Sequence, residues 1–213
     1  MAKVKPGSLF DGLSGKLGDF VFCTGAKGTI VKVAPKVRSV HKPTVSQQAA
    51  RARFNMANKF LVRAGRLIRL AKGSEENISP ALTVKNLMNE VIRGQYPNFF
   101  IDYTHLKVSA GTLTIPKEAS IKQIEDRIFA VRWGNRKRSR PAEVIMAMYS
   151  PLQDCWEIES SPLNSKCMVI EIPRYINEVL ECYLFFRYRD GTRVSDSMYL
   201  GSVVCAQNSS INY

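Results

Sequence analysis

The stretch that decides the fold of this chain is residues 43–72, PTVSQQAARARFNMANKFLVRAGRLIRLAK. Apolar side chains recur in it at steps of three and four residues, which is the spacing of one face of an α-helix. Thr44 and Gln47 have the spacing of a capping box, and Gly73 is a typical residue to end the helix. We therefore predict one long helix from Thr44 to Lys72 that is buried on one side. Its apolar stripe comprises Ala49, Met56, Ala57, Phe60, Leu61, Ala64, Leu67, Ile68 and Ala71.

The positive charge of the chain is concentrated near its N-terminus. Residues 1–72 carry 15 Lys and Arg against 2 Asp and Glu, whereas residues 73–213 carry 16 of each kind. The formal net charge of +13 therefore falls in the first third of the chain. A basic segment on a neutral body is typical of a protein that contacts an anionic partner, either nucleic acid or an acidic protein surface. The alternative is a basic segment that only keeps the protein soluble.

Residues 17–33 have the pattern of a β-hairpin. Apolar, β-prone runs at Leu17–Cys23 and Thr29–Val33 flank the turn-forming residues 24–28. We expect residues 1–16, which are rich in Gly and Lys, to form an irregular arm, and residues 36–42 to form a basic linker. A two-stranded hairpin is marginally stable alone. The sequence therefore predicts that the hairpin pairs with another sheet or another subunit.

A second, shorter helix follows a polar break at residues 74–79. Ser79-Pro80 is a typical helix start, the apolar residues from Val84 to Ile92 recur at helical steps, and Gly94 is a typical end. Together with the first helix, this pattern predicts an antiparallel helical hairpin. We expect the aromatic residues within 96–100 to pack where the helices meet the next domain.

From residue 103 onward, short apolar segments alternate with turn-forming residues, which is typical of an immunoglobulin- or fibronectin-like β-sandwich. We interpret Trp133 and Trp156 as core residues and Ser120–Asp126 as a short helix or a loop. The predicted fold class is α+β, with a hairpin and two-helix element in residues 1–100 and a seven-stranded sandwich in residues 101–213. The seven predicted strands are Tyr103–Val108, Arg127–Trp133, Glu143–Tyr149, Cys155–Glu159, Cys167–Ile172, Glu181–Tyr188 and Ser197–Val204.

The composition argues against membrane proteins, secreted proteins and metalloproteins. The chain has no apolar run of the roughly 20 residues that span a membrane. No apolar region follows the first lysines, as a secretory signal would require, so we expect a cytoplasmic protein. The five cysteines lack C-x-x-C spacing, and we interpret them as reduced, buried side chains. Because His41 and His105 are isolated as well, we predict no metal site, no disulfide and no cofactor.

No arrangement of side chains points to catalysis. Glu157 and Glu159 alternate onto one face of a strand and can form a carboxylate pair, but a solvated strand face is the favoured interpretation. The aromatic residues near the C-terminus can stack on nucleic-acid bases, but sandwich core is the favoured interpretation. These aromatic residues are Tyr183, Phe185, Phe186 and Tyr188. We therefore predict that the protein is not an enzyme.

Three segments carry a resemblance to a known family: SGKLGDFVFCTGAKGTIVKVAPKV (14–37), KPTVSQQAARARF (42–54) and FRYRDGTRVSDSMYLGSV (186–203). In these segments the chain resembles an uncharacterised family from Bacteroidota and their phages that is classified only as a domain of unknown function. The hairpin followed by the PTxxQQxxRxRF helix also resembles segments in structural proteins of such phages. The resemblance implies no activity, no cofactor and no catalytic residue.

These observations lead to two functional hypotheses. The first is a non-enzymatic structural protein of a multisubunit assembly, such as a phage head–tail connector or tail ring, which is cytoplasmic before assembly and part of the virion after it. The second is a nucleic-acid-binding module that uses the basic N-terminal helix, with contacts through residues 27–69. If the partner is an acidic protein surface, as we predict, one or two arginines should dominate, and we choose Arg51 and Arg53 of the helix. The full set of predicted partner-binding residues is Arg51, Arg53, Phe54, Lys59, Arg63, Arg66, Arg136, Lys137 and Arg138.

Overall fold

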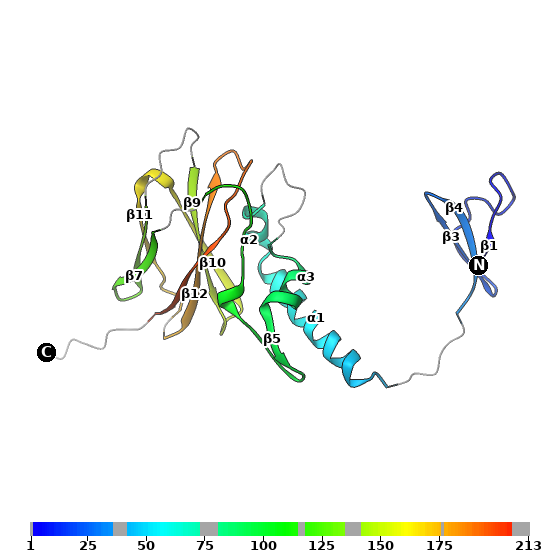
Figure 1. Cartoon of the computed structure of the whole chain (residues 1–213), viewed down its shortest axis with the longest axis horizontal. Helices are drawn as coiled ribbons and strands as arrows, with labels where there is room; N and C mark the ends of the chain where they lie inside the picture. The colour runs from blue at the N-terminus through cyan, green and yellow to red at the C-terminus, as the bar shows by residue number, and fades with distance from the viewer. Residues whose placement is uncertain are drawn as a thin grey trace. The chain divides into compact units, whose positions relative to one another are not determined.

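The computed structural model describes residues 2–35, 42–72, 81–114, 118–134, 142–175 and 177–205. The chain divides into two compact units, Met1–Thr44 and Val45–Tyr213, which are drawn in Figure 1. This division differs from the domain boundary that the sequence predicted after residue 100. The long helix and the segment that follows it belong to the same unit as the sheets, because their apolar side chains pack in one cluster with those of the strands.

The first unit is a four-stranded antiparallel sheet with strand order β1-β4-β3-β2. Its strands are β1 (Ala2–Lys3), β2 (Gly15–Leu17), β3 (Phe20–Gly25) and β4 (Gly28–Val33). The predicted hairpin is confirmed as β3–β4, and Gly28 follows the turn with a φ of 96° that favours glycine. The prediction of an irregular arm in residues 1–16 is wrong in part, because residues 2–3 and 15–17 pair with the two outer sides of the hairpin.

The predicted long helix is present in two pieces, α1 (Val45–Arg63) and α2 (Gly65–Leu70). The break lies at Ala64, next to the only glycine between residues 44 and 72. Glycine has a low helix propensity, which accounts for the position of the break. The buried residues of both pieces follow the predicted stripe and are Ala57, Phe60, Ala64, Leu67 and Ala71.

The second predicted helix is much shorter than expected. It consists of α3 (Val84–Asn86) and a π-helical turn, η1 (Leu87–Val91), and Thr83 caps its start by accepting a hydrogen bond from the Asn86 backbone N–H at 3.2 Å. The expected start at Ser79-Pro80 lies outside the described residues. From Ile92 the chain forms a hairpin of β5 (Ile92–Gln95) and β6 (Asn98–Ile101), so the predicted helix end at Gly94 is wrong. A side chain at position 94 would overlap the carbonyl oxygen of Asn98 across this hairpin.

The remaining strands of the second unit form two antiparallel sheets. One has the order β11-β8-β7 and the other the order β10-β9-β12-β13. Their bounds are β7 (Ala119–Glu125), β8 (Ile128–Trp133), β9 (Ala142–Ser150), β10 (Cys155–Pro162), β11 (Cys167–Glu171), β12 (Val179–Tyr188) and β13 (Met198–Val204). The protein is therefore rich in strands with fewer helices, which makes it α+β or mostly β in class.

Six of the seven predicted segments overlap these strands. The seventh, Tyr103–Val108, is not a strand: it starts with a 3₁₀ turn, η2 (Tyr103–His105), in which the side chain of Asp102 accepts a hydrogen bond from the Thr104 backbone at 3.1 Å. Ser120–Asp126, predicted as a helix or loop, lies mostly in β7. Ala119 and Ile121 of β7 pack on the buried cluster between the sheets, which explains why a strand forms there.

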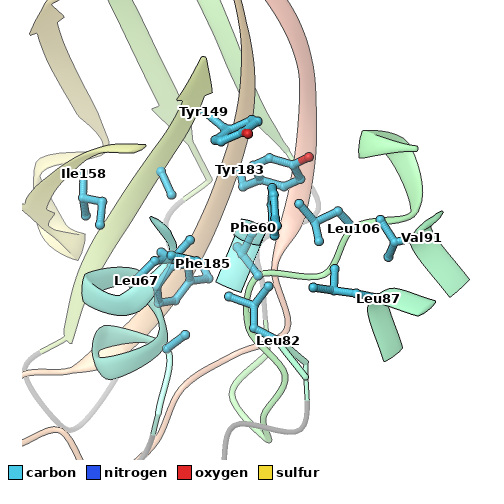
Figure 2. Close-up of a cluster of buried hydrophobic side chains, with 14 of the residues drawn as sticks. Phe60, Leu67, Leu82, Leu87, Val91, Leu106, Tyr149, Ile158, Tyr183 and Phe185 are labelled. Carbon is cyan, nitrogen blue, oxygen red and sulfur yellow. The ribbon is translucent and has the colours of Figure 1, made fainter. Parts of the chain in front are cut away.

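The four-stranded sheet is buried on both faces, because successive residues of a strand point to opposite faces. In β9, Ile145, Ala147 and Tyr149 join one cluster with the helices, whereas the residues between them join a second cluster with β8 and β11. Strand β12 divides in the same way. The second unit therefore has three layers: helices, the four-stranded sheet and the three-stranded sheet. Figure 2 shows the first cluster, in which Tyr149, Tyr183 and Phe185 extend from the strands toward the helices.

Aromatic rings join the helical layer to the sheet. The ring of Phe60 in α1 lies edge-on to Tyr149 at 5.2 Å and to Trp156 at 5.8 Å, measured between ring centroids. Trp133 is buried between the sheets, and its indole N–H donates to the carbonyl oxygen of Leu163 at 2.8 Å, which confirms its predicted core position. Trp156 is half-buried and packs on the helix-side cluster.

We predict that the part of the chain after Thr44 folds by itself, whereas the part after residue 100 does not. A fragment of residues 45–213 retains α1 and should unfold in one cooperative transition in urea. A fragment of residues 101–213 loses the helical layer and exposes Tyr149, Tyr183 and Phe185, so it should lack that transition. Tryptophan fluorescence against urea measures both. Equal cooperative transitions for the two fragments would show that the helices are dispensable.

Replacing Phe60 by alanine should lower the free energy of unfolding by about 3–5 kcal/mol, the usual cost of removing a buried phenylalanine ring. The matched control is Val62→Ala in the same helix, because Val62 is 78% exposed. The control should change stability by less than about 0.5 kcal/mol. Urea denaturation of the two variants gives both values, and a loss no larger for Phe60→Ala than for the control would contradict the packing described above.

Candidate interaction surfaces

Arg53, one of the two cations expected to dominate partner binding, makes its contacts within the chain. Its guanidinium donates a hydrogen bond to the carbonyl oxygen of Ile92 at 2.7 Å and lies over the ring of Phe99, 5.5 Å from the centroid. Its Nε is buried and has no partner in the described part of the chain. Arg53 therefore holds the β5–β6 hairpin against α1. Its role as a partner contact stays a prediction.

Lys59 and Arg63 are both paired with one carboxylate. The side chain of Asp154, in the turn between β9 and β10, lies 3.6 Å from the Lys59 ammonium and 3.7 Å from the Arg63 guanidinium. It also accepts a hydrogen bond from the hydroxyl of Tyr149 at 2.8 Å. The two cations are 75% and 57% exposed, so each pair contributes little to stability but reduces the net charge of this part of the helix.

The other predicted residues of the helix are exposed. Arg51 and Arg66 form no ion pair with any residue in the described ranges, and Phe54 is 48% exposed. Arg51 and Phe54 are three residues apart and so are neighbours on the helix surface. Arg51 and Arg66 are separated by about 22 Å at 1.5 Å per residue, so the structure does not bring them together. Arg136, Lys137 and Arg138 lie outside the described residues.

Three exposed apolar residues on the sheet of the first unit form a row that the sequence analysis did not single out. Leu17, Phe20 and Val33 are neighbours on β2, β3 and β4, since Phe20 pairs with both Leu17 and Val33. Their exposed fractions are 63%, 51% and 71%. We call these three residues the apolar row. The alternation of residues along each strand could have shown from the sequence which side chains share a face. It could not show that β2 pairs with the hairpin, and only this pairing aligns the three side chains.

The loop between β1 and β2 covers the other end of the same sheet face. Phe10 stacks on Phe22 with ring centroids 5.9 Å apart, and the backbone N–H of Gly12 donates to the hydroxyl of Thr29 at 2.9 Å. The hydroxyl of Thr24 donates to the carbonyl oxygen of Leu13 at 2.7 Å. Within residues 2–35, only Phe22 and Thr29 are buried. The loop therefore gives the sheet a very small interior and leaves the apolar row uncovered.

Lysines occupy the opposite face of this sheet. Lys16 and Lys32 are the cross-strand partners of Val21, so they lie on the face away from Phe20 and Phe22. Residues 1–44 contain eight Lys and Arg against two Asp, a formal net charge of +6. The first unit thus combines a partly apolar face with a basic face.

The residues considered for chemistry have structural roles. Glu157 accepts a hydrogen bond from the hydroxyl of Tyr175 at 2.9 Å and pairs with Arg174 at 3.4 Å. Burial raises the pKa of Tyr175, and its hydrogen bonds to Cys155 and Glu157 add to the shift, so its phenol stays protonated. Tyr183, Phe185 and Phe186 are buried, and Tyr188 is half-buried and packs on the cluster between the sheets, which confirms the core interpretation.

The five cysteines are unpaired. Cys182 and Cys205 are buried as expected, and burial raises the pKa of Cys205 to about 11. Cys23 is exposed, contrary to the expectation, because it lies on the open basic face of the small sheet. The described ranges contain no group of three or more side chains placed to hold a metal ion. In the same ranges, no helix has the length and apolar character needed to cross a membrane.

A family model described as "Family of unknown function (DUF6266)" matches residues 12–201. A search of curated proteins found no match to the chain.

Arg53→Ala should lower the free energy of unfolding by about 2–3 kcal/mol, because it removes a hydrogen bond to a charged group and leaves the Ile92 carbonyl without that donor. Arg51→Ala, two residues away and exposed, is the matched control and should change stability by less than about 0.5 kcal/mol. Urea denaturation of both variants is the measurement. Equal small effects would mean that Arg53 is available to a partner after all.

Proposed function

The chain belongs to the DUF6266 family of unknown function, and from this premise we propose that it is a non-enzymatic structural protein that assembles with other copies of itself through its first unit. The family match over residues 12–201 confirms the resemblance to a domain of unknown function. A virion component such as a head–tail connector or tail ring is the assembly that the further resemblance to phage structural segments favours.

The observation that carries the proposal is the uncovered apolar row on a unit with almost no interior. A domain of about 40 residues usually needs a disulfide, a metal or oligomerisation to be stable. Cys23, the only cysteine of the unit, is unpaired, and no metal-ligand group occurs among its described residues. Association would bury Leu17, Phe20 and Val33. A partner surface would supply the interior that the unit lacks.

We also propose that the second unit is a fibronectin-like sandwich. Its sheets of three and four strands share a buried cluster, and the connections β8–β9, β10–β11 and β11–β12 each pass from one sheet to the other. This alternation between sheets supports a Greek-key sandwich, an architecture common in modular binding and structural domains. Since fold alone does not establish function, the assembly proposal rests on the first unit.

Nucleic-acid binding through residues 27–69 is the second candidate. The exposed cations Lys27, Lys32, Arg51 and Arg66 favour it. Against it, Arg53, Lys59 and Arg63 have partners within the chain, which reduces the basic surface that the helix offers to phosphates. Such binding would weaken steeply as salt concentration rises.

The test of the assembly proposal is the double change Leu17→Lys and Phe20→Lys in the full chain. We expect the unchanged protein to form an oligomer whose mass, by size-exclusion chromatography with light scattering, depends on concentration. The double variant should remain monomeric, because two ammonium groups would have to be buried at the interface. Leu152→Lys, at a side chain 79% exposed in the second unit, is the matched control and should assemble normally.

Both tryptophans lie in the second unit, so their fluorescence should show that this unit stays folded in each variant. A monomeric unchanged protein, or a double variant that assembles like it, would contradict the proposal. Sub-micromolar, salt-dependent binding of random duplex DNA, tighter than the roughly micromolar non-specific norm, would favour the second candidate instead.

A further inference from the structure

The two sheets of the second unit leave one side open. β10 is the last strand of its sheet and β11 is the last strand of the other, so each has an edge that no described strand pairs with. At the opposite side, β7 and β13 lie next to each other. Two pockets of about 460 and 240 Å³ occupy the open side and share Glu159, Ile170 and Glu171, so they form one groove.

The groove has an apolar floor and an acidic rim. Met148, Met168 and Ile170 line it from the core between the sheets. Glu157, Glu159 and Glu171 also line it, and the single cation in the lining, Arg174, is already paired with Glu157. Glu159 and Glu171 are exposed. The lining therefore carries a net negative charge beside apolar surface.

The glutamates point into the groove because of their register in β10. Trp156 and Ile158, which alternate with them, pack on the helix-side cluster, so Glu157 and Glu159 face the three-stranded sheet. Inward-pointing charges on an edge strand prevent unspecific pairing with another edge. Here they would repel the same acidic edge of a second copy and admit a basic one. The groove is thus selective in the sign of charge that it accepts.

We propose that this groove receives the basic first unit of a second copy of the chain. The inference rests on the proposed function and names its partner surface. The first unit has a formal net charge of +6, an uncovered apolar row on one sheet face, and Lys16 and Lys32 on the opposite face. β2 is the last strand of its sheet, so its edge presents Leu17 on one side and Lys16 on the other. This edge, inserted into the groove, would bring Leu17 to the apolar floor and Lys16 to the carboxylates of Glu159 and Glu171. A nucleic acid does not fit, because the rim repels phosphate.

The contact is head-to-tail, since a unit from one copy meets a different unit of the next. Interfaces of this kind generate rings when the rotation closes and filaments when it does not. A closed dimer, in which each copy donates its first unit to the other, is the smallest case. The groove therefore explains how a chain with two unlike units can build a symmetric assembly.

The test is a charge exchange in the full chain. Variant A carries Glu159→Lys and Glu171→Lys, variant B carries Lys16→Glu and Lys32→Glu, and variant C carries all four changes. A and B should each weaken association by about tenfold or more, because they place like charges opposite each other. C should recover most of the loss. Glu118→Lys with Glu125→Lys, at exposed positions at and just before β7 at the other side, is the matched control and should associate normally.

Sedimentation at a series of protein concentrations measures the association, and tryptophan fluorescence confirms that each variant is folded. Normal association of A, or no recovery in C, would overturn the groove as the acceptor. If Leu17→Lys with Phe20→Lys abolishes assembly while A has no effect, the assembly proposal stands and only this inference fails. If the unchanged protein is monomeric at every concentration, both fail.

Discussion

The burial of both faces of the four-stranded sheet is the constraint on which the second unit depends. The packing of Phe60 against Tyr149 and Trp156 covers one face, and the three-stranded sheet covers the other. A sheet with two apolar faces is unstable when one of those faces is exposed to water, because burial of apolar surface is the dominant favourable contribution to folding. The helices are therefore a layer of this unit and not a separate element attached to it.

The two units differ in how much apolar surface they bury. The second unit has two large buried clusters and is complete in itself, whereas the described part of the first unit buries only Phe22 and Thr29. The first unit is also where the positive charge is least compensated, since the helix cations Lys59 and Arg63 pair with Asp154. The proposed assembly rests on this difference, because the basic first unit of one copy would bury its apolar surface in the acidic groove of another.

The expectations that were wrong share a cause. Ser120–Asp126 was predicted to be a helix or loop, but most of it forms β7, which pairs with β8 and packs on the cluster between the sheets. The apolar residues from Val84 to Ile92 were predicted to lie on one helix, but Ile92 pairs with Ile101 in a β-hairpin. The contacts of Arg53 with the Ile92 carbonyl and the Phe99 ring were not predicted either. In each case a partner distant in sequence decided the outcome.

The sequence by itself determined the long helix, the N-terminal hairpin, most of the strands and the confinement of positive charge to the first third. These are local properties, set by the spacing of side chains along a few turns or strands. Only the tertiary structure decided the boundary after Thr44, the apolar row and the acidic groove between β10 and β11. The physical reason is that each of these depends on which strands become neighbours, and strand pairing is set by contacts between residues far apart in the chain.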